Sequence, residues 1–127
     1  MIKKETNLIF VSVVTVINVL VATGYSEAGL IDPSSIMPAT SVVTDSTLIF
    51  AMYAAARTIP IAILAIWAIV KRIRQELFIL GILVGAMQFF DGFIGIYQHD
   101  LGKSIGPFVL ALLQIIALTM VPKKERI

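Results

Sequence analysis

Cysteine is absent from the chain, and histidine occurs once, as His99. Without cysteine the chain cannot form a disulfide, a thiolate metal site or a thiol nucleophile. A single histidine is also too few for zinc or haem sites built on several imidazoles. The composition therefore predicts no metal site and no cofactor, offers no catalytic residues, and favours a protein that is not an enzyme.

Charge is scarce as well. Only 14% of the 127 residues are charged, whereas 58% are hydrophobic. A water-soluble domain of this size leaves a large fraction of its surface exposed, so it could not bury so much apolar surface. The net charge of +2 is too small to indicate a nucleic-acid partner. We expect the lipid bilayer to surround this chain.

Four stretches approach or exceed the roughly 20 apolar residues needed to cross the hydrocarbon core. They are apolar all round rather than alternating, which is typical of helices and not of membrane strands. Short connections make successive helices antiparallel neighbours. The predicted fold class is an all-α membrane protein, a four-transmembrane-helix up-and-down bundle in a single domain over 1–127. The predicted spans are 8–23, 47–70, 77–97 and 104–121, with an extracytoplasmic loop at 24–46.

Basic residues predict the orientation. Eight of the ten Lys and Arg residues precede the first span, fill the second connection or follow the last span. The positive-inside rule places these segments, and so both termini, in the cytoplasm of a multi-pass protein of the cell (cytoplasmic) membrane. An alternative interprets Lys3, Lys4 and the first span as a cleaved secretory signal. Retaining the first helix is simpler, because cleavage would leave three spans.

The segment "AMYAAARTIP" places a permanent cation, Arg57, inside the second span. It lies roughly 15 Å from the outer end, where a charge costs on the order of 3 kcal/mol. Asp91 is the carboxylate within the third span. Side chains lean toward the N-terminus of their own helix, so in antiparallel helices the two groups lean toward a common depth. We predict an Arg57–Asp91 ion pair, with Tyr53 one turn away and a kink at Pro60.

Other polar residues recur at similar depth on the first, third and fourth spans. Together they predict a polar pocket enclosed by four helices and open toward the outside. Asn18 and Gln114 could instead be interhelical hydrogen-bond glue, and the ion pair could simply join two helices. Gly81 and Gly85 allow the third helix to approach another backbone closely. The pocket candidates are Arg57, Asp91, Gln88, Tyr53, Gln114 and Asn18.

From Tyr53 to Leu118 the chain resembles the DoxX-like group of small four-helix bacterial membrane proteins. The resemblance lies in Arg57 early in the second span, the basic turn "KRIRQE", Asp91 followed by small residues, and a short loop before the last helix. It implies a bundle with a polar pocket near the outer leaflet, in a group that includes a subunit linked to quinone-dependent sulfur oxidation and membrane assembly factors. The cysteine of some relatives is missing, so no redox activity is carried over.

Several functions stay open at this point. The first is binding of a lipid-like or small amphipathic molecule in the pocket, or service as a subunit of a membrane complex. The second is a small transporter or channel subunit that uses Asp91, and the third is a purely structural assembly partner. A membrane enzyme has few catalytic groups available. Expected partners are the bilayer, a lipid-like ligand, and a second copy or another membrane protein.

Overall fold

The structure is a computed structural model that describes residues 2–121, and the side chains of residues 4–121. This part of the chain contains helices and no strands, which confirms the all-α part of the prediction. Each of the four long helices is long and apolar enough to cross a membrane, which suggests a multi-pass membrane protein. The predicted basic cluster of Lys123, Lys124 and Arg126 lies outside the described residues. The elements are α1 (Ile2–Ile31), the 3-10 helix η1 (Pro33–Ser35), α2 (Asp45–Val70), α3 (Arg74–Tyr97) and α4 (Leu101–Thr119).

The first helix is longer than predicted at both ends. Residues 24–31 continue α1, so the connection to α2 begins at Asp32 rather than at Gly24. This segment contains Glu, Ala and Leu, which are good helix formers, and its two glycines do not interrupt the helix. The α2 helix begins with a capping box, in which Thr44 accepts from the backbone of Thr47 and the Thr47 side chain accepts from Thr44.

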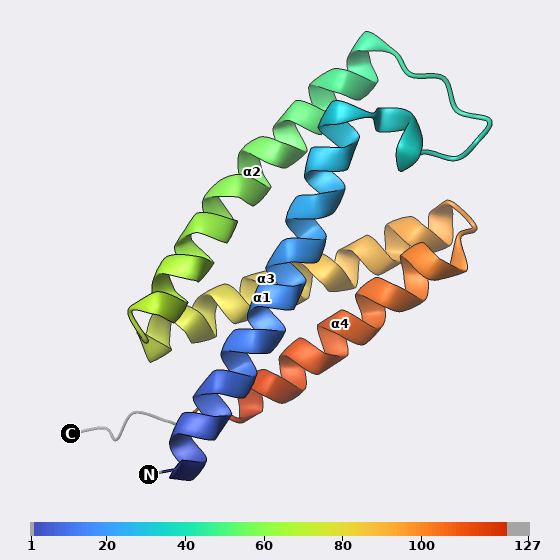
Figure 1. The fold of residues 1–127 in the computed structure, drawn as a ribbon. Helices are drawn as coiled ribbons and strands as arrows, with labels where there is room; N and C mark the ends of the chain where they lie inside the picture. Colours follow the sequence, from blue (N-terminus) through green and yellow to red (C-terminus); the bar gives the residue numbers. More distant parts are fainter. Residues whose placement is uncertain (1, 122–127) are drawn as a thin grey trace.

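The chain runs up and down, so the start of α1 and the end of α4 lie at one end of the molecule (Figure 1). We call this the basic end, because it carries Lys4 and the α2–α3 turn with Lys71, Arg72 and Arg74. The opposite end holds η1 and the α3–α4 turn. We call it the acidic end, after Glu27, Asp32, Asp45 and Asp100.

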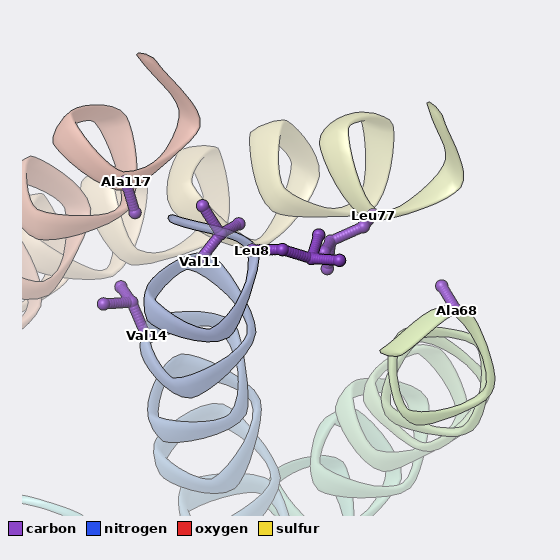
Figure 2. Packing of buried hydrophobic residues seen from close by; sticks show 6 residues of the cluster. All are labelled: Leu8, Val11, Val14, Ala68, Leu77 and Ala117. Atoms are coloured by element: carbon purple, nitrogen blue, oxygen red, sulfur yellow. The ribbon is translucent and has the colours of Figure 1, made fainter. Parts of the chain in front are cut away.

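The core near the basic end is built around α1 (Figure 2). Leu8, Val11 and Val14 of α1 pack in one buried cluster with residues of all three other helices. The α1 helix therefore occupies a central position, and the other helices pack around it. The partners in this cluster are Ala68 of α2, Leu77 of α3 and Ala117 of α4.

The α2 and α3 helices are close at their connecting turn and diverge toward the acidic end (Figure 1). In its acidic-end half, α2 is held to α1 by a hydrogen bond of 2.8 Å between the hydroxyls of Ser26 and Thr58. The Thr58 hydroxyl also donates to the carbonyl oxygen of Ala54. Here α2 lies along α1, and α3 forms its most extensive interface with α4.

Candidate functional site

The centre of the molecule holds a hydrogen-bonded polar network. Asn18 of α1 and Gln114 of α4 are both fully buried. The Asn18 Nδ2 group donates to Gln114 Oε1 at 2.9 Å, and Gln114 Nε2 donates to the Thr15 hydroxyl at 3.0 Å. Gln88 of α3, 1% exposed, donates from Nε2 to the backbone carbonyl oxygen of Asn18 at 3.2 Å. Three of the six pocket candidates thus join α1, α3 and α4 directly.

This network satisfies most of its polar atoms internally. The Asn18 Nδ2 group also donates to the carbonyl oxygen of Val14, one turn earlier, at 3.1 Å. Asn18 Oδ1 is the buried atom of the network that has no hydrogen-bond partner within the described residues. Apolar side chains flank the network, with Val11 and Val14 toward the basic end. The arrangement matches interhelical hydrogen-bond glue, the alternative that the sequence left open for Asn18 and Gln114.

The predicted Arg57–Asp91 ion pair is wrong. Among the described side chains, of residues 4–121, the ion pair joins Lys103 Nζ to Asp100 Oδ2 at 3.9 Å, next to the α3–α4 turn. The physical reason is the divergence of α2 from α3, which places the two charges on helices that separate toward the acidic end (Figure 1). The short turn keeps α2 and α3 close where they are joined, but farther along α2 the Ser26–Thr58 hydrogen bond holds α2 to α1.

Arg57 and Asp91 are both exposed to the surroundings of the isolated chain. The interaction of the Arg57 side chain is with the ring of Tyr53, whose centroid lies 5.8 Å from Cζ. Tyr53 is itself 56% exposed. Asp91 makes no hydrogen bond or ion pair with another described residue. The polar centre is therefore built by three helices rather than four, and the charged candidates lie outside it.

The faces that carry these two charges can be followed along each helix. Arg57 lies four residues before Ile61 and eleven before Ala68, so these side chains share one face of α2. On α3, Asp91 lies seven residues after Val84 and shares its face in the same way. Ile61 packs against the buried cluster that contains Val84. We call these two surfaces the diverging faces, since they meet at that cluster and separate toward Arg57 and Asp91.

A pocket of about 160 Å³ opens at the acidic end, next to the diverging face of α3. Gln88 contributes to its lining, so it lies beside the central network. Its cation, Lys103, donates to Gln98 Oε1 at 3.2 Å and to the carbonyl oxygen of Ile36, and thereby fastens the α1–α2 connection to α4. The polar lining residues are Tyr25, Gln88, Asp91, Gln98 and Lys103.

Of the six predicted pocket residues, Gln88 and Asp91 line this pocket, and the sequence analysis missed Tyr25, Gln98 and Lys103. The spacing of Asp100 and Lys103 could have placed Lys103 in the first turn of α4, because Asp100 caps α4 by accepting from the backbone amide of Lys103. A second concavity of about 300 Å³ lies between α1 and α2 at the basic end, and its lining is mostly apolar.

Glycines set the close approach of α3 to α4. Gly81, Gly85, Gly92 and Gly95 are all buried. A Cβ atom at Gly92 would lie 2.7 Å from the ring of Phe108, and one at Gly95 would overlap the backbone of Lys103. The expected close approach of the third helix is thus present, and α4 is the partner.

Within the described residues, no group of three or more His, Asp or Glu side chains could hold a metal ion. No protein-family model matches the chain, and neither the curated proteins nor the solved structures contain a match. The resemblance to the DoxX-like group therefore stays a prediction.

Proposed function

We propose that this chain is a non-enzymatic subunit of an assembly within the membrane, and that it docks its partner on the diverging faces of α2 and α3. The observation that carries the proposal is the exposure of Arg57 and Asp91 without an ionic partner. A charge inside the hydrocarbon core is costly, so such residues face a protein interior or a counter-charge. Within the described residues, Arg57 meets only the ring of Tyr53, and Asp91 lines one side of the pocket without forming an ion pair. A membrane-spanning partner would supply the counter-charge that each group lacks.

The distribution of charged residues between the two ends favours one orientation. We propose that the chain lies in the cytoplasmic membrane with its basic end in the cytoplasm. Lys71, Arg72 and Arg74 lie together at the α2–α3 turn, whereas Glu27 and Asp32 lie at the acidic end. The positive-inside rule supports this direction. Arg57 and Asp91 then belong to the outer half of the membrane, on the side of the pocket.

The test of the assembly role is the molecular mass of the purified chain in a mild detergent. We expect the wild-type chain to elute in a complex, and Arg57→Gln or Asp91→Asn to elute mainly as the monomer. Lys71→Gln is the matched control, since it removes a cation from a turn outside the spans. A wild-type chain that is monomeric in detergent and also in lipid nanodiscs would refute the proposal.

The pocket favours a second candidate function, which is binding of the polar head of a small amphipathic molecule. Its lining combines the carboxylate of Asp91 with the amides of Gln88 and Gln98 and the hydroxyl of Tyr25. Native mass spectrometry of the chain released from membranes would detect a retained lipid. We expect Gln98→Leu to lose that lipid with the oligomeric state unchanged. Retention of the same lipid by this variant would count against the pocket.

Transport through the centre has less support. The Asn18, Gln88 and Gln114 side chains fill the space between three helices and bond to one another or to backbone. A water path would have to break these bonds.

A further inference from the structure

We propose that the partner on the diverging faces is a second copy of this chain, with Arg57 of each copy paired to Asp91 of the other. The inference rests on the proposed role as an assembly subunit and specifies the occupant. Two unpaired intramembrane charges of opposite sign lie on one molecule, and they cannot meet within it because α2 and α3 diverge (Figure 1). Two copies related by a two-fold axis would satisfy all four charges at once.

The depths of the two groups allow this pairing. A two-fold axis along the membrane normal keeps every residue at its own depth, so paired groups must lie at similar depths. The cluster formed by Ala65, Val84 and Val19, with Ile61 packed against it, gives a common reference level. Arg57 lies four residues beyond Ile61, or about 6 Å along α2, and Asp91 lies seven residues beyond Val84, or about 10 Å along α3.

The remaining difference is small compared with an arginine side chain. Arg57 leans toward the start of α2 at the acidic end, and Asp91 leans toward the start of α3 at the basic end. Both leanings reduce the difference in depth. The symmetry also places the basic ends of both copies on the same side, so the dimer agrees with the proposed orientation.

The surfaces around the charges suit helix packing. Ala54 is exposed on α2, one turn from Arg57, and presents a small side chain to an approaching helix. Ile94 on α3 is 54% exposed, one turn from Asp91. In the dimer, each α2 would cover the exposed part of the other copy's α3. Each desolvated ion pair would then sit between apolar and small side chains.

Charge reversal in separate chains tests the pairing. In a dimer of Arg57→Asp chains, two carboxylates face each other at each contact. In a dimer of Asp91→Arg chains, two guanidinium groups do so. When the two variants are co-expressed with different affinity tags, both contacts of the mixed dimer regain opposite charges. We expect each variant alone to lose at least tenfold in dimer yield, and the mixed pair to recover at least half of the wild-type yield. An ion pair within one chain would not be restored by mixing.

Cysteine cross-linking on otherwise wild-type chains covers the case in which charge reversal prevents folding. The natural chain has no cysteine, so introduced thiols react without background. We expect Ala54→Cys and Ile94→Cys chains, mixed in one membrane, to form a cross-linked dimer with a short bis-maleimide. Ser12→Cys, on the α1–α2 groove at the basic end, is the control and should not cross-link with either.

The outcomes separate the two proposals. Recovery by mixing together with the Ala54–Ile94 cross-link supports the second copy. A complex with a different protein that Arg57→Gln and Asp91→Asn abolish, without recovery by mixing, overturns the second copy and leaves the assembly role intact. A monomer in every condition overturns both.

Discussion

Replacing Gly95 by alanine is expected to destabilise the fold through the α3–α4 interface. An added Cβ would overlap the backbone of Lys103, which cannot move aside like a flexible side chain. Overpacking of a well-packed site costs about 1–3 kcal/mol, and a backbone obstacle places this variant at the upper end. Alanine regains at most about 1 kcal/mol of helix propensity. We expect a net loss of about 2 kcal/mol in the free energy of unfolding.

Two further variants make this a graded series. Gly92→Ala meets the side chain of Phe108 rather than backbone, so we expect a smaller loss of about 1 kcal/mol in the free energy of unfolding. Gly24→Ala is the matched control, because nothing lies within 4 Å of its added Cβ and the residue is also inside a helix. The measurement is unfolding in mixed detergent micelles, followed by far-UV circular dichroism. Equal stability of Gly95→Ala and Gly24→Ala would refute the predicted backbone approach.

Three other predictions concern the network, a turn and the orientation. Gln114→Leu removes two buried hydrogen bonds, one from Asn18 Nδ2 and one to the Thr15 hydroxyl, so we expect a loss of about 1–3 kcal/mol in the free energy of unfolding in the same assay. Wild-type stability would mean that these two bonds contribute nothing. His99→Gly should raise the free energy of unfolding by about 0.5–1 kcal/mol, because His99 has a φ of 55° that glycine adopts without strain. A less stable variant would contradict this expectation. A membrane-impermeant maleimide should label Ser35→Cys in intact cells and Lys71→Cys only after permeabilisation, and the reverse pattern would invert the proposed orientation.

The helical content followed from the sequence, but the arrangement of the helices did so only in part. Long apolar runs and short connections predicted four sequential helices, because a chain this apolar is expected in lipid, where a helix satisfies its own backbone hydrogen bonds. The buried amides of Asn18 and Gln114 were also predictable as interhelical glue. The approach of α3 to α4 followed from the glycines, although the identity of the partner helix did not.

The hydropathy of the helices could not have shown why the Arg57–Asp91 prediction is wrong. That prediction assumed that helices joined by a tight turn stay adjacent along their whole length. A hydrogen bond between the hydroxyls of Ser26 and Thr58 joins α2 to α1 in the region where α2 diverges from α3. Serine and threonine are common in apolar helices, so neither residue by itself predicts which neighbour it bonds.

The sequence by itself determined that this chain has four apolar helices, that most of its basic residues flank them on one side in the chain order, and that two opposite charges lie within apolar helices. These properties depend on composition and on order along the chain. Only the tertiary structure decided which polar residues meet, because packing around α1 sets the angles between helices. That packing buries the amides together and leaves Arg57 and Asp91 apart, and their separation is the basis for expecting a second copy.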